Sequence, residues 1–430
     1  MENIRPFRRA AFRWFAWAAC ALAWAAAGPA SPAGGQPETR VQIKEIRVYG
    51  NTVTSRRVIL QYCEFREGDL LTVGELTRKI KRTKRNLENT HFFARVNVFD
   101  LPRPDPGRAT IMIDVAEGST WHVAASTRQV RVSRENIGGE AVTLGVEGGL
   151  DRERVFYNQP WVFDQDLEAS AAPFFENRHL TSIENDRGEV GEWFYHDAVG
   201  GEGGLGYIIT RRSASGLNLL VEHVDYFDDR FKADPWGRFG VAPHANLFAL
   251  RPYARWDNRD DELYPTRGFF VEARGELAPA GVGDYEYKGI EGDLRGYVSP
   301  GLAFVVASRI LAGTMTETTP YIRRIDIHGS EGLRTINSYR TVGTRAFLAT
   351  VELRRKLFRS PIFDAWFEGV AFLDAGRTWD PGQPFRFEYF DYAFGPGVRL
   401  HMRSPFYFDW RGELNVHGDL AIYASARRAF

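Results

Sequence analysis

The residues best suited to a specific chemical interaction are two arginines, Arg334 and Arg340. They lie in the stretch RIDIHGSEGLRTINSYRTVGTRA from Arg324 to Ala346. Glycines interrupt this stretch too often for a helix, and it is too irregular for one strand, although strand-like segments lie on both sides. A guanidinium group can bind a carboxylate through two parallel hydrogen bonds. Loops of this length, roughly thirty residues, are usually functional in compact structures. We therefore expect ion pairing, and not bond breaking, to be the chemistry of this segment.

Other segments resemble catalytic or ligand-binding motifs only superficially. The glycine-rich run GGEGGLG at 200–206 is followed by neither a Lys-Ser/Thr pair nor a helix, so it predicts a turn and a strand instead of a phosphate loop. The acidic run DNRDDE at 257–262 has Glu262 where a calcium loop requires glycine. The nine histidines form no HExxH motif, and there is no Gly-x-Ser-x-Gly motif. We expect no enzymatic activity, no catalytic residues, no metal site and no cofactor.

Composition and charge restrict the class of protein. The 430 residues include 55 basic and 55 acidic side chains, so nothing favours binding to nucleic acid. Beyond the N-terminal segment no run reaches roughly 18 apolar residues, which excludes helical membrane proteins but not transmembrane barrels.

Four arginines before an apolar run predict an export signal within residues 1–33 and a linker at 34–40, with a membrane anchor as the alternative. After cleavage Cys63 is the only cysteine, so no intramolecular disulfide can form.

Residues 41–119 predict a small α+β domain with the element order β-α-α-β-β. Thr54 or Ser55 can cap a short helix, and Thr72 can begin a second, basic and amphipathic helix. Two strand-like segments, FFARVNVFDL and ATIMIDVAEG, follow the second helix. A basic helix face could bind nucleic acid, but a face that is simply solvated is the better interpretation.

From Thr120 onward, segments of about ten residues alternate between polar and apolar side chains, and turn residues separate them. Paired charges crowd the polar face, and large aromatic residues lie on the apolar face, which is typical of a barrel with lipid outside and water inside. A soluble sandwich is the alternative. We predict a transmembrane antiparallel β-barrel of about 16 strands over residues 120–430. The expected strands are 120–132, 140–149, 152–162, 166–176, 188–199, 202–212, 215–227, 243–256, 267–279, 284–298, 301–314, 344–356, 366–377, 391–402, 405–415 and 418–430.

The motifs and their order resemble the BamA/TamA superfamily of outer-membrane insertion and translocation proteins. The segments IRVYGN, REGD and THFFARVNV resemble a single POTRA domain. The segments VFYNQPWVF, WDNRDDELYPTRGFF, GSEGLRTINSYR, VELRRKL and FLDAGRTWD resemble the barrel of that family. Each motif alone is weakly specific, but the ordered set covers essentially the whole chain after the export signal.

In that family a long outer loop folds back into the lumen and places an arginine against acids of the barrel wall. The resemblance assigns this role to Arg334, with Glu352 and Asp374 as its acceptors and with Gly332 and Gly376 in the same anchor. The alternation independently places both acids on the polar face, which we expect to line the lumen.

The loop departs from the family pattern after its arginine. Thr335 and Ile336 stand where the family usually has glycine and an aromatic residue, so the tip of the loop could turn differently. Arg340 is the less favoured substitute for Arg334. The alternative is an outward surface loop with a solvated arginine.

The resemblance implies a machine for outer-membrane protein assembly in which a weak seam joins the first and last barrel strands. Opening that seam exposes unpaired backbone groups that can template a strand of a client protein. The edge strand of the POTRA domain, around Val96 and Val98, could bind clients in the same way. To the seam itself we assign Trp121, Val123, Ile422 and Phe430.

The expected partners are unfolded outer-membrane or secreted client proteins and the lipid bilayer. Accessory periplasmic or lipoprotein subunits are compatible with this interpretation. We expect the barrel in the bacterial outer membrane and the POTRA domain in the periplasm. The alternative function is a translocation pore that secretes one dedicated partner through the lumen, although relatives of that kind usually have two POTRA domains.

Overall fold

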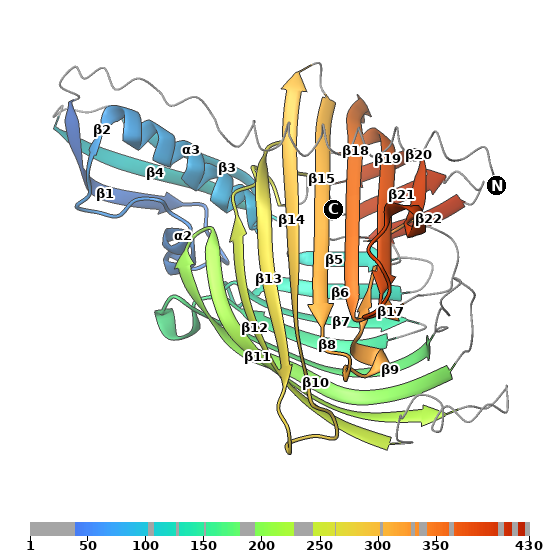
Figure 1. The fold of residues 1–430 in the computed structure, drawn as a ribbon. Coiled ribbons are helices and arrows are strands. Elements are labelled where there is room, and N and C mark those ends of the chain that lie inside the picture. Colours follow the sequence, from blue (N-terminus) through green and yellow to red (C-terminus); the bar gives the residue numbers. More distant parts are fainter. Residues whose placement is uncertain are drawn as a thin grey trace.

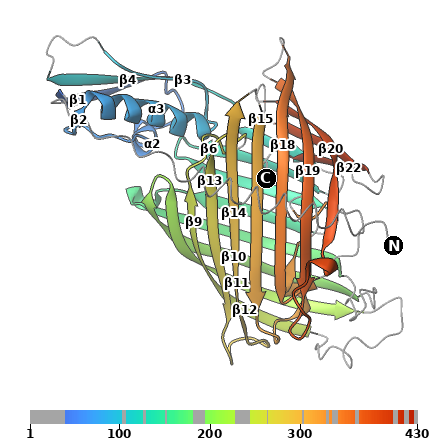
Figure 2. The ribbon, with the colours of Figure 1, turned by 45° about the horizontal axis from the view of Figure 1, so that its top comes forward.

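A computed structural model of the chain shows two parts, a small sheet with helices and a large sheet that curves into a barrel (Figures 1 and 2). The predicted export signal, Arg340 and Phe430 lie outside the residues that the structure describes. Those residues are 39–101, 107–125, 129–149, 152–180, 194–227, 244–262, 264–301, 304–327, 332–334, 342–360, 365–402, 408–414 and 420–425.

The small domain has the predicted order of elements with one additional short strand, β2. Its sheet has the order β2-β1-β4-β3, in which β1 runs parallel to β4. Both predicted helix starts are present: Ser55 caps the first helix, and the Thr72 side chain accepts a hydrogen bond from the backbone of Glu75. The elements are β1 (Arg40–Tyr49), α2 (Arg56–Gln61), β2 (Leu70–Thr72), α3 (Val73–Asn89), β3 (Phe93–Asp100) and β4 (Arg108–Glu117).

The core of the small domain lies between its helices and one face of its sheet. Leu76 and Leu87 of α3 are buried against Ile43 and Ile111 of the central strands. Cys63 belongs to the same core, and its burial raises the pKa of the thiol to about 12. The thiol is therefore protonated and poorly reactive at neutral pH.

In the part of the chain that the structure describes, the large sheet contains sixteen strands, which agrees with the predicted count. All described pairings between them are antiparallel, and most join strands that are consecutive in the sequence. In pairing order the strands are β5 (Trp121–Ala125), β6 (Gln129–Ile137), β7 (Val142–Gly149), β8 (Arg152–Gln159), β9 (Leu167–Leu180), β10 (Phe194–Thr210), β11 (Ser213–Phe227), β12 (His244–Asp257), β13 (Gly268–Ala278), β14 (Tyr287–Gly301), β15 (Phe304–Met315), β18 (Arg345–Arg359), β19 (Ala365–Trp379), β20 (Asp391–Met402), β21 (Phe408–Leu414) and β22 (Leu420–Ser425).

Two errors in the predicted strands compensate each other in this count. The segment 120–132, predicted as one strand, contains β5 and the beginning of β6. The segments 188–199 and 202–212 were predicted as two strands, but their described parts, 194–199 and 202–210, belong to a single long strand, β10. The glycine-rich run at 200–206 is therefore not a turn but the middle of a strand.

The glycines of β10 are required by close packing against β11, which explains the second error. A Cβ atom on Gly200 would lie 2.4 Å from the backbone oxygen of Val221, and one on Gly204 would lie 2.4 Å from that of Leu217. Glycine is usually read as a chain breaker, but in a strand it also marks a close approach of two backbones.

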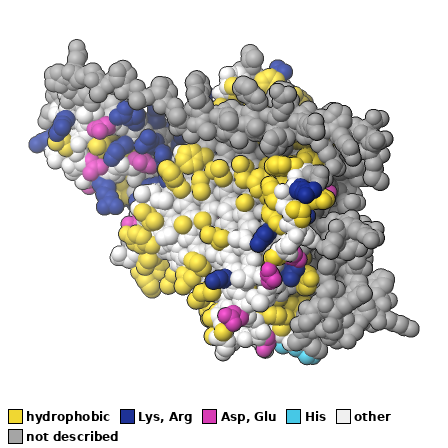
Figure 3. Space-filling model, in the orientation of Figure 1, with side chains coloured by type: hydrophobic (Ala, Val, Ile, Leu, Met, Phe, Trp, Pro, Cys, Tyr) yellow, Lys and Arg dark blue, Asp and Glu magenta, His cyan; other side chains and the backbone are white. Residues whose placement is uncertain are grey.

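The barrel wall is apolar outside and charged inside. On β18 the side chains of Thr350, Glu352 and Arg354 are buried within the barrel, whereas Leu353 between them is 45% exposed. Figure 3 shows hydrophobic side chains distributed over the outer face of the strands. This confirms the predicted orientation of the two faces. The two helices of the small domain are too short and polar to cross a membrane, and the described residues contain no other candidate helix.

The small domain is docked on the turns that follow β6 and β8. The Asn136 side chain donates a 2.7 Å hydrogen bond to the hydroxyl of Thr54, and the backbone nitrogen of Ser55 donates to the oxygen of Gly139 at 3.0 Å. Trp161 packs edge-on against the ring of Tyr62, with 4.7 Å between the ring centroids. The domain is thus attached to the barrel beside its first strands.

Candidate functional site in the barrel lumen

The long segment between β15 and β18 enters the barrel interior from the end that lies opposite the small domain (Figure 1). It forms a short helical turn, η3 (Tyr321–Arg323), and a two-stranded ladder of β16 (Ile325–Asp326) and β17 (Val342–Gly343). Figure 1 shows β17 alongside β18 and β19. The described residues therefore show that this loop folds into the barrel, as predicted.

Apolar contacts place the loop against one side of the barrel wall. Ile325, Ile327 and Leu333 are buried in one cluster with Leu311 of β15 and Leu348 of β18. The backbone nitrogen of Leu333 donates a 2.6 Å hydrogen bond to the oxygen of Ile327. This turn directs the next residue, Arg334, toward β18 and β19.

Arg334 forms the predicted ion pairs with both acids. Its Nε and Nη2 atoms donate to the two carboxylate oxygens of Asp374 at 2.7 and 2.6 Å, which is the two-bond geometry that a guanidinium allows. Its Nη1 atom donates to Glu352 at 2.6 Å, and its backbone nitrogen donates to Asp374 at 3.2 Å. The guanidinium carbon also lies 3.9 Å from the centre of the Phe372 ring.

Two further arginines, which the sequence reasoning did not identify, complete the cluster around Glu352. Arg354 donates to Glu352 at 2.7 Å, and Arg399 of β20 donates to it at 2.7 and 3.1 Å. We call Arg334, Glu352, Arg354, Asp374 and Arg399 the luminal cluster. All five are buried, so each charge depends on its partners and not on bulk water.

The strand register explains why these side chains meet. Thr350 pairs with Asp374 and Glu352 pairs with Phe372, so the two acids are diagonal neighbours on the luminal face of adjacent strands. Arg354 lies on the same face as Glu352 because the two are two residues apart on one strand. Arg399 could not be placed without knowing that β20 lies beside β19.

Other contacts tie the loop to a different part of the wall. Arg323 forms an ion pair with Glu222 of β11. Arg324 donates to Asp380, which follows β19, at 2.8 Å. The loop therefore runs across the lumen from β11 to β18 and β19.

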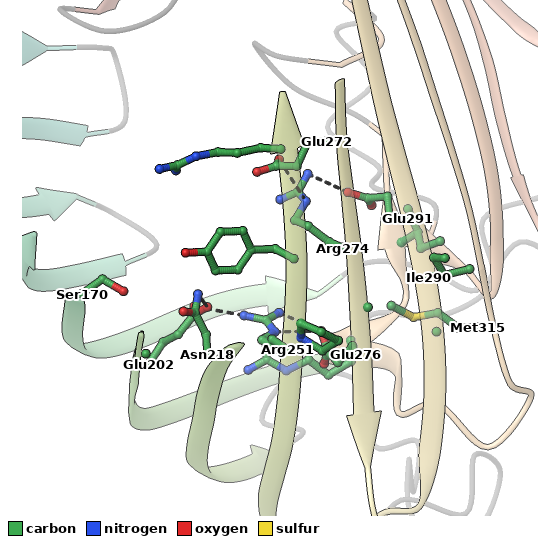
Figure 4. Close-up of a pocket in the computed structure, with 18 of the residues that line it drawn as sticks. Ser170, Glu202, Asn218, Arg251, Glu272, Arg274, Glu276, Ile290, Glu291 and Met315 are labelled. Atoms are coloured by element: carbon green, nitrogen blue, oxygen red, sulfur yellow. Dashed lines mark hydrogen bonds and ion pairs between the residues drawn. The ribbon is translucent and has the colours of Figure 1, made fainter. Parts of the chain in front are cut away.

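A polar cavity of about 520 Å³ lies beside the loop, between it and the luminal faces of β12, β13 and β14 (Figure 4). Arg251 projects into it and binds Glu202 at 3.0 Å and Glu276 at 2.8 Å, while Arg274 binds Glu291 at 2.7 Å. The wall thus carries matched charges instead of an excess of either sign. Such a surface suits a water-filled lumen.

The two glycines assigned to the loop anchor have different surroundings. A Cβ atom on Gly376 would lie 2.7 Å from Cδ1 of Ile327 and 3.1 Å from the backbone oxygen of Phe347. Gly376 therefore leaves the space into which the loop packs. Gly332 is half-buried and precedes the buried Leu333.

The residues assigned to the seam lie in the two end strands of the sheet. Trp121 and Val123 of β5 point outward, with exposed side chains, and Ile422 lies in β22, where it pairs with Gly412. Parts of β22 lie within 8 Å of β5, yet among the described residues no ladder joins these two strands. Phe430, the fourth assigned residue, lies outside the described part of the chain.

The residues assigned to client binding on the POTRA domain lie on an edge strand, as expected, but their side chains are not accessible. Strand β3 is an edge strand of the small sheet, but the side chains of Val96 and Val98 are buried in the core of the domain. Alternate residues of a strand point to opposite faces, and these two face the helices. A client could therefore contact the backbone of β3 but not these two side chains.

Comparisons with known proteins identify the fold. A family model described as Omp85 superfamily domain matches residues 136–408, and one described as POTRA, surface antigen variable number repeat, matches residues 41–118. No curated protein matches the sequence.

Similar solved structures include BamA from Haemophilus ducreyi lacking POTRA domains 1–3, with 17% identity and a TM-score of 0.52 over 90% of this chain and 83% of that chain. CdiB from Escherichia coli has 12% identity and a TM-score of 0.58, over 90% and 76%. CdiB from Acinetobacter baumannii has 12% identity and a TM-score of 0.53, over 90% and 73%. These structures share the fold, and the family model covers more than half of the sequence. The chain therefore belongs to the Omp85 superfamily of outer-membrane β-barrel proteins, which act in protein insertion and transport.

Proposed function

We propose that this protein is an insertion factor that assembles client β-barrel proteins at the seam between β5 and β22, without catalysis and without a cofactor. The proposal rests on one observation. These two strands lie next to each other, but among the described residues no hydrogen-bond ladder joins them. Unpaired backbone groups in a bilayer cost several kcal/mol each, so a client strand that pairs with them is stabilised there.

The position of the loop supports lateral exit over passage through the lumen. The loop crosses the interior from Glu222 on β11 to Asp374 on β19, and buried ion pairs hold it at both ends. A polypeptide that moved through the lumen would first have to break these pairs. A client that enters at the seam leaves them intact.

The small domain is placed to deliver clients to the seam. It contacts the turns after β6 and β8, close in the sheet to β5. We propose that it lies in the periplasm, where clients arrive, and that the free edge of β3 pairs with them through its backbone.

A disulfide across the seam tests the proposal. Val123→Cys is combined in turn with Ala421→Cys, Ile422→Cys or Tyr423→Cys, and mass spectrometry identifies the pair that oxidises. In liposomes, the locked protein should fail to convert an unfolded outer-membrane client into its heat-modifiable folded form, and a reductant should restore this activity. The buried thiol of Cys63 should not interfere, because its pKa is raised to about 12.

A second disulfide controls for cross-linking as such. Val221 and Phe248 are register partners on β11 and β12, away from the seam, so a bond between cysteines at these positions should leave assembly unchanged. If client assembly continues with the seam locked, the insertion proposal is wrong. Secretion of a dedicated partner through the lumen, for which the polar cavity beside the loop provides a path, would then be favoured.

A further inference from the structure

Four polar side chains meet on the outward face of β11 and β12, near the end of the barrel that lies opposite the POTRA domain. His223 and Asp225 are two residues apart on β11, and their register partners on β12 are Asn246 and His244. Residues two apart and their directly opposite partners share one face of a sheet. Figure 3 shows histidine side chains exposed at this rim of the barrel.

The carboxylate of Asp225 lies between the two imidazoles. Its Oδ1 atom is 3.3 Å from Nε2 of His223 and 2.5 Å from Nδ1 of His244. One ligand atom from each of the three residues can be chosen so that all lie within 4.8 Å of one another. The two rings are nearly parallel, with an angle of 8° between their planes. Three potential ligand atoms for a metal ion therefore already lie close together.

Two neighbouring side chains fix the orientation of His223. Its Nδ1 atom lies 2.9 Å from the amide oxygen of Asn246, which can only accept a hydrogen bond. Asp284, in the connection between β13 and β14, accepts hydrogen bonds from the backbone nitrogen of Asn246 at 2.6 Å and from its side chain at 3.3 Å. This arrangement places the proton of His223 on Nδ1 and leaves the lone pair on Nε2, beside Asp225. Metal-binding histidines are commonly oriented by such a hydrogen bond to their second ring nitrogen.

We infer that His223, Asp225 and His244 form a binding site for a divalent transition-metal ion, of which zinc is the best-suited example. Imidazole nitrogens bind zinc and the neighbouring transition metals better than they bind calcium and magnesium. Those two ions prefer oxygen ligands. Two histidines and one carboxylate leave at least one coordination position open to water or another oxygen ligand. The bound ion would replace the proton that Nδ1 of His244 shares with Asp225. That proton moves to Nε2 of the same ring or to water.

Such a site would join the outer ends of β11 and β12. The sequence reasoning predicted no metal site because the ligands lie on two strands, and His244 is 19 positions from Asp225. Only the antiparallel register brings them together.

Zinc titration of the full-length protein tests the inference. The protein is purified in detergent without a polyhistidine tag, stripped with EDTA and titrated with zinc chloride by calorimetry. One equivalent should bind saturably. His223→Ala and His244→Ala should each weaken binding by about tenfold or more, and Asn246→Ala, which removes only the orienting group, by about tenfold. Heat-modifiable gel mobility shows that each variant is folded.

Two controls make the outcome decisive. His91→Asn removes a histidine of the POTRA domain at a positive φ of 58°, which asparagine tolerates, and it should not change zinc binding. Magnesium chloride should produce no saturable signal. The inference is overturned if zinc does not bind saturably, or if binding persists unchanged in the double variant His223→Ala/His244→Ala.

Discussion

The wall made of β18, β19 and β20 and the seam between β5 and β22 belong to one sheet but are held together by very different interactions. Strands β18 and β19 are each 15 residues long, and their luminal faces carry the buried luminal cluster. In the described part of the chain, strand β5 has five residues and β22 has six. No described hydrogen-bond ladder joins β5 to β22. The wall residues of the luminal cluster thus lie on strands that are two to four places away from β22 in the order of the sheet.

This difference suggests a division of labour within one sheet. A cluster of buried charges stabilises a structure only while all of its partners are present, because a buried charge left unpaired is costly. The wall around Glu352 therefore resists partial opening. Among the described residues no such cluster joins β5 to β22, so thermal opening should be concentrated at the seam. The wall of β18, β19 and β20, which we call the braced wall, should keep the rest of the barrel intact.

Hydrogen exchange should show the largest difference between the two regions. Local opening free energies range from near zero at weakly held edges up to the full free energy of unfolding in core strands. We expect the backbone amides of β5 and β22 to exchange at the shortest labelling times and those of β18 and β19 to remain protected. Mass spectrometry of the protein in liposomes measures this. Equal protection of the four strands would remove the basis for a weak seam.

Replacing the central acid of the luminal cluster should strongly destabilise the braced wall. Glu352→Gln preserves the shape of the side chain but leaves Arg334, Arg354 and Arg399 with one fewer negative charge. Removal of one partner from a buried ion pair costs about 3–5 kcal/mol. The temperature at which the folded band disappears in heat-modifiability gels should therefore fall.

A matched acid in the lumen serves as the control for that variant. Glu272 lies on β13 and forms a 3.4 Å ion pair with Arg274, whose side chain is half exposed. Because solvent screens such a pair, Glu272→Gln should cost less than about 1 kcal/mol. Similar shifts for the two variants would mean that the luminal cluster has no special energetic role.

Removing the loop arginine should release the loop while leaving the wall largely intact. Arg334→Ala removes the hydrogen bonds to Asp374 and Glu352, but Glu352 keeps two arginines. Asp374 loses its guanidinium partner, so we expect a loss of about 3 kcal/mol, at the lower end of the range for breaking a buried ion pair, because water beside the released loop can solvate the carboxylate. Planar-bilayer recordings should show higher and more variable conductance. Arg267→Ala, at an exposed arginine in the turn before β13, should change neither property; unchanged conductance in Arg334→Ala would show that other contacts hold the loop.

The luminal anchor could be predicted from the sequence because alternation within single strands and one family motif were enough to identify it. Alternation along single strands placed Glu352 and Asp374 on the inner face, and the family resemblance supplied Arg334 as their partner. Arg399 was missed because its role depends on the neighbourhood of β19 and β20, which alternation alone does not reveal. The His223–His244 pair was missed for the same reason. Contacts between strands require the register, and the register is fixed by the whole sheet.

The strand boundaries show a second limit of local reasoning. The glycines of β10 break the pattern of side chains without breaking the strand, because every residue from Tyr195 to Ile208 is paired with β11. The valines at 96 and 98 were correctly placed on an edge strand, β3, but the burial of their side chains depends on the helices that pack against that face of the sheet. Pairing and burial are properties of the whole sheet and not of the single residue.

The variant Gly376→Ala should have the smallest effect. It tests whether the packing of the loop, and not only its charges, stabilises the braced wall. In Gly376→Ala the new methyl group would meet Ile327 of the loop at 2.7 Å and the oxygen of Phe347 at 3.1 Å. In Gly369→Ala, on the same strand, it would meet only the Leu357 side chain at an ordinary 3.4 Å. Overpacking of the first kind costs about 1 kcal/mol or somewhat more. The unfolding temperature should therefore fall for Gly376→Ala and stay constant or rise slightly for Gly369→Ala. Equal shifts would show that the alanine substitution weakens β19 itself, and that the position of the loop depends on its ion pairs alone.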